Sequence, residues 1–266
     1  MTDSADAMIL APTLAALGDD PRRGLDRLHD AGFRAVQLSA AQPGLRPREL
    51  DGSARRDLLA TLRRTELLGA GIDCWIPAEH YRDAAQLDRA VNATRAAIEL
   101  AADLGRLPVS LNLPRAAPMT ADGDPDGSHD DSSIIEAIDA LATHAERFGI
   151  ALADHTHPPL AVPRGSAAVG IGIDPAAIIA RGESPARAVA AAGERIISAR
   201  LCDLLRSGMR GPPGDADDGQ LDVMAYRAAL SVVGYARPVI VDARQWSGTW
   251  TGLAQTAAAW AACTPF

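Results

Sequence analysis

The chain has 266 residues, 47% of them hydrophobic, and a formal net charge of −8. This composition is sufficient for one large core, and the charge without any basic cluster argues against a nucleic-acid partner. No apolar stretch approaches the roughly 18 residues that a membrane span needs, and Cys74, Cys202 and Cys263 are too scattered to predict a disulfide framework. We therefore expect a single cytoplasmic domain over residues 1–266, with residues 1–7 as a flexible N-terminus.

Lysine is absent, so all 26 basic residues are arginine. Schiff-base aldolases, pyridoxal-phosphate enzymes and P-loop nucleotidases each need a lysine amine at the reacting centre. The sequence excludes these three classes and the cofactors that go with them.

Eight short apolar segments have the near-continuous hydrophobicity of parallel strands that are buried on both faces. They comprise residues 8–11, 34–39, 72–77, 108–113, 150–154, 169–174, 197–202 and 239–242. Helical patterns over residues 21–31, 53–68, 87–104 and 133–148 separate them, and a glycine suited to a helix C-cap follows at Gly32, Gly71, Gly105 and Gly149. Eight strands in alternation with helices predict an α/β fold, a single (β/α)₈ TIM barrel.

Three connections carry further expectations. Residues 115–132 predict a mobile surface loop, and residues 211–222 a loop across the barrel mouth. Three prolines in residues 158–169 predict a short or missing helix there.

Gly170 and Gly172, in the predicted strand 169–174, lack the third glycine of a nucleotide-binding fingerprint, so no nucleotide is expected. Either they leave room beside Asp174 or they allow tight packing against a neighbouring strand.

Polar residues gather where strands end, which in a (β/α)₈ barrel is where active sites lie. Asp154, Asp174 and Asp242 end three of the last four predicted strands. Like charges that meet at one mouth require a cation or a proton between them. We therefore predict that these three aspartates converge in a functional site.

The order of several motifs resembles the xylose-isomerase-like barrel superfamily, in particular the sugar phosphate isomerases and epimerases. The motifs are IALADH, IGIDPAA, ARLCD, GDADDGQLD, VGY and VIVDAR, spread over residues 150–244. The resemblance spans almost the whole chain and implies the barrel fold. It also implies a divalent ion (Mn, Mg, Co or Zn) held by two Glu, one Asp and one His. The metal-ligand candidates here are Asp154, Asp174 and Asp242.

The departures from this pattern argue against a metal. Asp154 and Asp242 replace glutamates and reach about 1.5 Å less. Arg200 stands at the histidine position, and a guanidinium has no lone pair for a metal. Ala177 replaces a further histidine.

Three functions follow from the resemblance. The first is a sugar, sugar-phosphate or polyol isomerase or epimerase that works through an enediolate, with Asp154 and Asp242 as the two catalytic carboxylates. Its substrate would be a small carbohydrate-like molecule, bound by Arg200, Trp75, His80, Asn112 and Trp246. The second is a barrel that binds a small ligand or a partner without metal-dependent catalysis. The third, an apurinic-site endonuclease, needs more histidines and a basic groove. A homodimer is compatible with the sequence, which does not fix the oligomeric state.

The positive charge that an enediolate needs can come from a metal or from Arg200. Because arginine stays protonated at physiological pH, we predict that Arg200 points inward, pairs with Asp174 or Asp242, and takes over part of the electrostatic role of the metal. The alternative is an outward Arg200 and a metal site that is completed by a histidine from the fifth strand.

Overall fold

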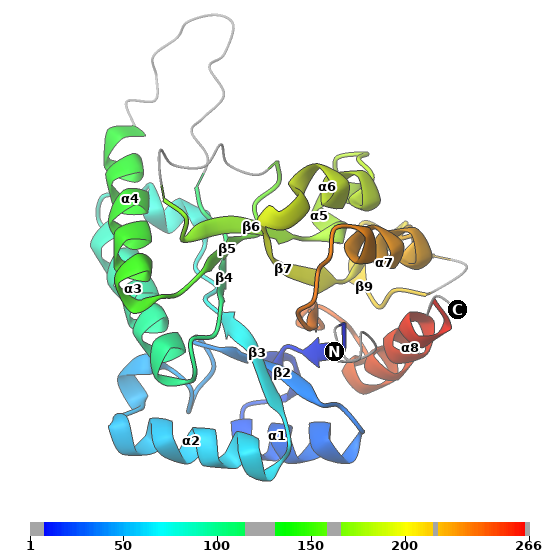
Figure 1. The fold of residues 1–266 in the computed structure, drawn as a ribbon, viewed down its shortest axis with the longest axis horizontal. Helices are drawn as coiled ribbons and strands as arrows, with labels where there is room; N and C mark the ends of the chain where they lie inside the picture. Colours follow the sequence, from blue (N-terminus) through cyan, green and yellow to red (C-terminus); the bar gives the residue numbers. More distant parts are fainter. Residues whose placement is uncertain (1–7, 115–130, 159–165, 215–217, 264–266) are drawn as a thin grey trace, which may run out of the picture.

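A computed structural model describes residues 8–114, 131–158, 166–214 and 218–263. Eight parallel strands run around a central axis in the order β1-β10-β7-β6-β5-β4-β3-β2, and a parallel bridge between Thr13 and Gln37 joins the first and last strands of this order. Figure 1 shows the strands inside a ring of helices. The predicted single (β/α)₈ barrel is confirmed. The strands are β1 (Leu10–Pro12), β2 (Ala35–Ser39), β3 (Leu68–Asp73), β4 (Val109–Leu111), β5 (Leu152–Asp154), β6 (Val169–Ile173), β7 (Ile196–Leu201) and β10 (Val239–Val241).

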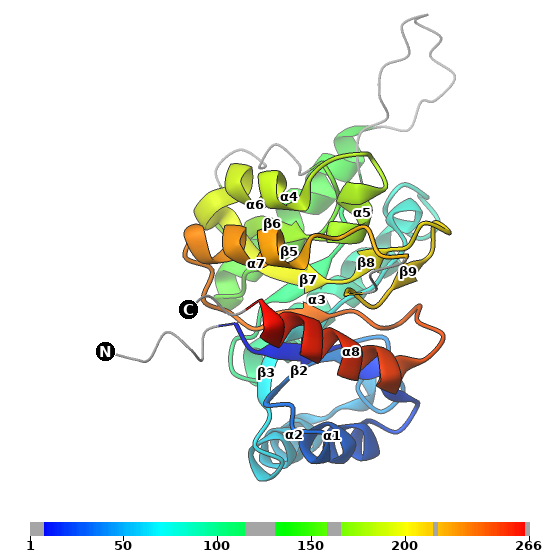
Figure 2. The same ribbon diagram turned by 90° about the vertical axis from the view of Figure 1, so that its right-hand side faces the viewer.

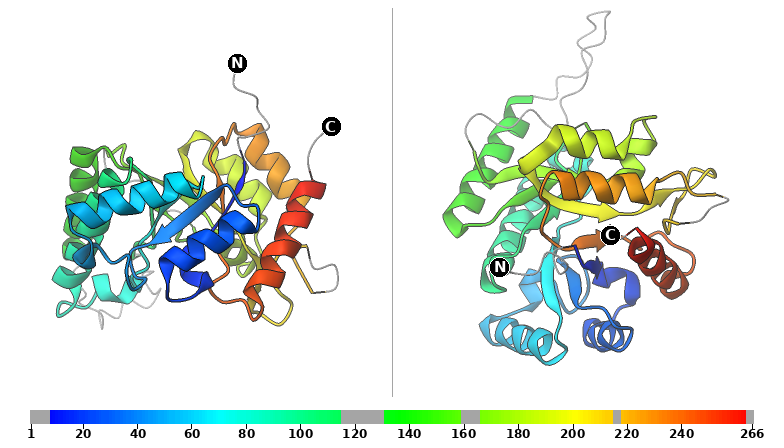
Figure 3. Two further views of the ribbon diagram at one scale, coloured as in Figure 1. Left: turned by 90° about the horizontal axis from the view of Figure 1, so that it is seen from below. Right: turned by 45° about the vertical axis from the view of Figure 1, so that its right-hand side comes forward.

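The helices cover the outside of the barrel, as Figures 2 and 3 show from other directions. Several begin at a side chain that accepts backbone N–H groups of the first turn, for example Asp20, Asp51 and Asp222. The α-helices are α1 (Pro21–Asp30), α2 (Gly52–Arg64), α3 (Leu87–Asp103), α4 (Asp131–Phe148), α5 (Pro175–Ile179), α6 (Pro185–Ala192), α7 (Val223–Val232) and α8 (Thr249–Ala262). Short 3₁₀ turns are η2 (Leu14–Leu17), η3 (Pro47–Glu49), η4 (Ala78–Tyr81) and η5 (Gly193–Arg195).

One predicted helix end is wrong. Gly32, Gly105 and Gly149 have the left-handed φ expected of caps, but Gly71 lies inside β3. The helix that was predicted for residues 53–68 ends at Arg64, and Glu66 adopts a φ of 52°. Strand β3 therefore begins at Leu68, earlier than the predicted residue 72, and ends at Asp73. Leu67 and Leu68 extended the apolar pattern of the helix although they belong to the turn and the strand.

The barrel interior is polar above a small apolar base. Ala11, Ala35 and Ile240 pack together as a separate cluster of the core. Above it, buried Thr13, Gln37 and Ser110 form a hydrogen-bonded row: Thr13 donates to Gln37 Oε1 (2.8 Å), and Gln37 Nε2 donates to Ser110 Oγ (3.2 Å). The larger apolar clusters involve the side chains that pack between strands and helices. A hydrophilic barrel lumen of this kind is suited to a polar ligand.

Some predicted segments fall partly or wholly outside the described residues. Residues 1–7 lie outside, as do most of the predicted loop 115–132 and residues 159–165 of the segment predicted to lack a helix. In the parts of that segment that are described, residues 158 and 166–169, no helix occurs. Across the described ranges, no helix combines the length and the apolar character that a membrane crossing requires.

Candidate functional site

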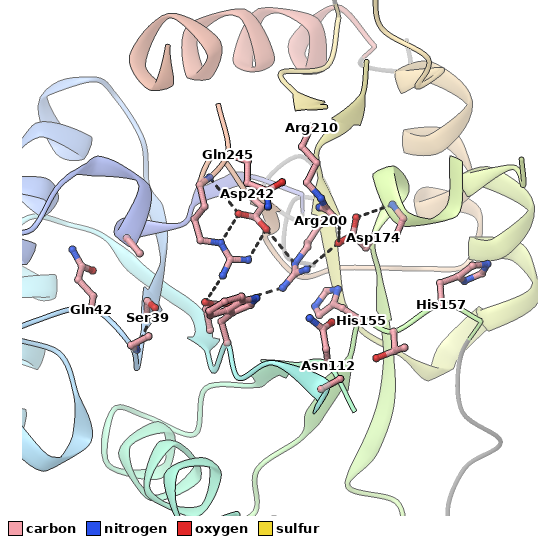
Figure 4. Close-up of a pocket in the computed structure, with 18 of the residues that line it drawn as sticks. Ser39, Gln42, Asn112, His155, His157, Asp174, Arg200, Arg210, Asp242 and Gln245 are labelled. Atoms are coloured by element: carbon pink, nitrogen blue, oxygen red, sulfur yellow. Dashed lines mark hydrogen bonds and ion pairs between the residues drawn. The ribbon is translucent and has the colours of Figure 1, made fainter. Parts of the chain in front are cut away.

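A cavity of about 670 Å³ opens at the carboxyl ends of the strands (Figure 4). Its polar lining comes from residues at or after the ends of β2, β3, β4, β5, β6, β7 and β10, together with a short antiparallel hairpin, β8 (Asp203–Leu204) and β9 (Arg210–Gly211). This is the end of the barrel at which active sites are found. The charged or polar lining residues include Ser39, Gln42, Asp73, Asn112, His155, His157, Asp174, Arg200, Arg210, Asp242, Arg244 and Gln245.

Three buried aspartates from three strands meet in this cavity: Asp73 at the end of β3, Asp174 directly after β6 and Asp242 directly after β10. Asp174 also begins helix α5, since its Oδ1 accepts a hydrogen bond from Ala177 N. Asp174 and Asp242 converge as predicted. The third carboxylate is Asp73 rather than Asp154.

Arg200 lies among these three carboxylates, as Figure 4 shows for Asp174 and Asp242. Its Nη1 donates to Asp174 Oδ2 at 2.9 Å, while its Nη2 is 3.5 Å from Asp73 Oδ1 and its Nε is 3.8 Å from Asp242 Oδ2. The Tyr226 hydroxyl holds the strand there through a 2.8 Å hydrogen bond to the Arg200 carbonyl. The predicted inward orientation of Arg200 and its pairing with Asp174 are found.

Two further arginines form hydrogen bonds to these carboxylates at the rim of the cavity. Arg210, on β9, donates from Nη2 to Asp174 Oδ2 at 2.9 Å. Arg244 donates from Nε and Nη2 to the two oxygens of Asp242 (2.7 and 2.6 Å) and from Nη1 to Asp73 Oδ2 (2.7 Å). Three guanidinium groups thus neutralise three carboxylates, and the cluster carries no net charge.

Burial and the neighbouring arginines shift the pKa values of the three aspartates in different directions. Burial alone would raise the pKa of Asp174, but Arg200 and Arg210 outweigh it and the pKa lies below its usual range. Burial is likewise outweighed at Asp242, where Arg244 and Arg200 hold the pKa well below its usual range. At Asp73 burial prevails over the same two arginines, so its pKa is raised. Asp73 is the member of the cluster that binds a proton most readily.

His155, directly after β5, completes the floor of the cavity. Burial, with the nearby Arg200 charge, lowers the pKa of His155 well below its usual value, so the imidazole is neutral at pH 7. Its Nε2 lies 3.2 Å from Ser110 Oγ, at the end of the row that begins at Thr13. The ring lies against Gly172, where a Cβ would approach it to 2.5 Å. Gly172 therefore makes room in the lumen, whereas Gly170 packs tightly against Ile197 on β7.

We expect Gly172→Ala to lower the free energy of unfolding by between about 1 and 3 kcal/mol, because the added methyl group overpacks the imidazole of His155. Urea unfolding measures the change. Gly52→Ala is the matched control, since its Cβ would come no closer than 3.6 Å to another residue. The steric explanation fails if Gly172→Ala costs as much in a His155→Ala background as in the native chain.

Asp154 does not line the cavity. Its Oδ1 accepts backbone N–H groups of Leu113 (3.1 Å) and Thr156 (3.0 Å) and so joins the ends of β4 and β5. Side chains alternate along a strand, and Asp154 shares the face of Leu152, which packs in the outer core. The predicted pairing of Asp154 with Asp242 in one cavity is therefore corrected: the residue directly after β5, His155, lines the cavity instead.

The predicted substrate-binding residues divide into two groups. Arg200, Asn112 and Trp75 line the cavity, and the Trp75 side chain is 55% exposed beside it. His80, in η4, and Trp246 do not line it. Trp246 packs in the core with Cys202, Val241 and Leu253, because Gly252 leaves space for its ring.

Asp73 and Arg210 were not predicted to belong to the site. His155 and Arg244 are polar residues that follow predicted strand ends, but the predicted substrate-binding set did not include them. The alternation along the strands indicates two of them: Asp73 follows Gly71 on the inner face of β3, and His155 follows Ala153 on the inner face of β5. Arg244 stands two residues beyond Asp242. Nothing in the sequence indicates Arg210, since its place depends on the β8–β9 hairpin.

The residues present do not fit the divalent ion that the resemblance implies. Among the described residues, no group of three or more His, Cys, Asp or Glu side chains is arranged to hold a metal. The oxygens of Asp174 and Asp242 accept hydrogen bonds from arginines or from backbone N–H groups. A guanidinium lies among the carboxylates and has no lone pair to offer.

Comparisons with known proteins agree with this fold. A sequence model of the family described as "Xylose isomerase-like TIM barrel" matches residues 25–262. The solved structure of a xylose isomerase domain protein from Planctomyces limnophilus is similar with a TM-score of 0.74 at 18% identity, over 97% of this chain and 96% of that one. No curated protein matches.

Two sugar epimerases have the same fold at low identity. D-Psicose 3-epimerase from Clostridium cellulolyticum H10 gives a TM-score of 0.74 at 14% identity, over 96% of this chain and 98% of that one. A 3-keto-D-glucoside 4-epimerase from E. coli gives 0.74 at 15% identity, over 96% and 100%. The family match extends over most of the sequence, and the predicted resemblance is confirmed: the chain belongs to the xylose isomerase-like TIM barrel family.

Proposed function

We propose that this chain binds a sugar or related polyol in the barrel mouth and moves a proton beside its carbonyl group, as a sugar isomerase or epimerase in which arginine supplies the positive charge. The observation that carries the proposal is the Arg200 guanidinium among three buried aspartates from three strands. The sugar epimerases that share the fold support the choice of substrate class.

The cavity presents polar atoms that a polyol would satisfy. Gln42 Oε1, Asp73 Oδ1 and Arg200 Nε are buried, belong to lining residues, and have no hydrogen-bond partner among the described residues. Buried polar atoms of this kind are costly unless a ligand or water pairs with them. The set contains both acceptors and a donor, as sugar hydroxyls require, and Trp75 offers an aromatic face at the edge.

The charge arrangement suits an enediolate. Proton loss beside a carbonyl group places negative charge on the carbonyl oxygen, and a fixed positive group that is already desolvated stabilises it strongly. Arg200 is fixed in place by its ion pairs, and its guanidinium carries a positive charge. With Arg200 as the positive group, the proposed reaction needs no lysine side chain, nucleotide or metal ion.

A second candidate function is binding without reaction. One observation favours it: both oxygens of Asp242 are held by Arg244, and its lowered pKa makes it a weak base. In that case the same cavity would hold a sugar or polyol unchanged.

Ligand-observed NMR in D₂O tests both functions in one sample. The native protein is incubated with a panel of neutral ketoses and aldoses, including D-psicose, D-tagatose, D-fructose and L-ribulose. Saturation transfer reports binding, and deuterium incorporation beside the carbonyl group reports proton transfer. We expect both signals for at least one sugar. Binding without deuterium incorporation supports the second candidate, and absence of binding across the panel contradicts the proposal.

A further inference from the structure

We infer that Asp73 is the catalytic base of this cavity, the group that takes the proton from the substrate carbon; the inference rests on the proposed function. Neither the family match nor the resemblance points to a carboxylate at the end of β3. The assignment rests on which carboxylate oxygens of the three aspartates accept hydrogen bonds from the three arginines.

The two oxygens of the Asp73 carboxylate have different partners. Oδ2 accepts a 2.7 Å hydrogen bond from Arg244 Nη1, which fixes the orientation of the group. Oδ1 has no hydrogen-bond partner among the described residues, and Arg200 Nη2 lies 3.5 Å from it. The residue is 1% exposed and lines the cavity. One oriented carboxylate oxygen thus remains for a ligand.

The other two aspartates of the cluster have no such oxygen. Asp174 accepts hydrogen bonds from Ala177 N at Oδ1 and from Arg200 and Arg210 at Oδ2. Asp242 accepts from Arg244 at both oxygens. Their pKa values are lowered, whereas burial raises the pKa of Asp73. A base accepts a proton more effectively when its pKa lies closer to the working pH.

The short separation between Asp73 Oδ1 and Arg200 suits the first step. Ionised Asp73 takes the proton from the carbon beside the carbonyl group, the C–H electron pair forms the new C=C bond, and the carbonyl π electrons move onto oxygen. The resulting oxyanion lies against the Arg200 guanidinium. The proton on Asp73 exchanges with solvent, which in D₂O introduces deuterium, and Asp73 then delivers a proton to the former carbonyl carbon while the hydroxyl proton passes between the two oxygens. The product is the isomeric sugar, and no oxidant, reductant or co-reactant is consumed.

The charged groups around Asp73 define the pH dependence. Arg244 and Asp242 face it from the end of β10, Arg200 from β7, and the Ser39 hydroxyl from β2. Arg244, whose pKa is raised, stays charged, and Asp242, whose pKa is lowered, stays ionised at neutral pH. Proton transfer should therefore rise with pH as Asp73 ionises and then reach a plateau, with a midpoint above the ordinary aspartate value of about 4.

The test compares native protein with Asp73→Asn, Asp73→Glu and the control Asp26→Asn, whose side chain is exposed on α1. The sugar is the panel member that exchanges fastest with native protein. We expect Asp73→Asn to slow deuterium incorporation at least about 100-fold while saturation transfer still detects binding. Asp73→Glu should recover part of the rate with a shifted pH midpoint, and circular dichroism checks that each variant is folded.

The outcomes separate the two proposals. Exchange by Asp73→Asn within about threefold of native overturns the role of Asp73 and leaves the proposed function standing. Absence of exchange in the native protein, with binding retained, contradicts the proposed reaction and with it the role of Asp73. If Asp73→Asn does not fold, the native pH profile and Asp73→Glu decide: a rate that is independent of pH and identical in both proteins overturns the inference.

Discussion

Replacement of Arg200 by methionine is expected to lower the free energy of unfolding at pH 7 by about 3 to 5 kcal/mol. Methionine preserves much of the side-chain volume but leaves Asp73 and Asp174 without the charge that now lies 3.5 and 2.9 Å from them. A buried carboxylate without a partner must protonate, recruit a cation or open the structure. Chemical denaturation of native and variant protein measures the loss.

The loss should depend on pH in a defined direction. Without Arg200, the pKa values of Asp174 and Asp242 rise, so the variant regains stability relative to native protein as the pH falls and these carboxyls take up protons. Arg195→Met, at an exposed position just before β7, should change stability by no more than about 0.5 kcal/mol. A loss for Arg200→Met that is as small as for Arg195→Met would show that Arg200 does not hold the aspartates together.

Asp242→Asn is expected to cost about 2 to 3 kcal/mol above pH 5. The substitution removes the charge that Arg244 contacts at 2.7 and 2.6 Å. The cost is smaller than for Arg200 because the Arg244 side chain is 23% exposed and can regain water. Unfolding curves from pH 7 to pH 2 measure the difference.

The sign of the pH effect follows from the lowered pKa of Asp242. A depressed carboxyl pKa contributes stability that is complete above the unfolded value of about 3.9 and is lost as the pH falls through the folded value. The stability difference between native protein and Asp242→Asn should therefore begin to narrow near pH 4 and keep narrowing toward pH 2. A difference that stays constant down to pH 2 would mean that Asp242 contributes through packing rather than through charge. Asp26→Asn serves as the exposed control.

The fold could be predicted from the sequence because its signals are local. Buried parallel strands are apolar on both faces, and each of the eight predicted segments overlaps a strand of the barrel. The errors lie at boundaries, as at Leu67 and Leu68, where an apolar run continues from helix α2 through a turn into β3. The β8–β9 hairpin was not predicted, because two-residue strands carry no periodicity.

The site could be predicted only in part, because orientation depends on which face of a strand a residue occupies. Arg200, Asp174 and Asp242 were assigned to the site and line the cavity. Asp154 was assigned to the site because it ends a predicted strand, although a shift of one residue along a strand moves a side chain to the other face. Asp73 was missed because the strand was predicted to continue to residue 77, which placed this carboxylate within the strand instead of at its end.

Calorimetric titration with Mn²⁺ tests most directly whether Arg200 takes the electrostatic role that the resemblance assigns to a divalent ion. The native protein and Arg200→Ala are titrated side by side, with Arg195→Ala as control. We expect no micromolar binding to native protein or to the control, and binding to Arg200→Ala, where Asp73, Asp174 and Asp242 lose their shared cation. Micromolar binding to the native protein that Arg200→Ala leaves unchanged would contradict this role of Arg200.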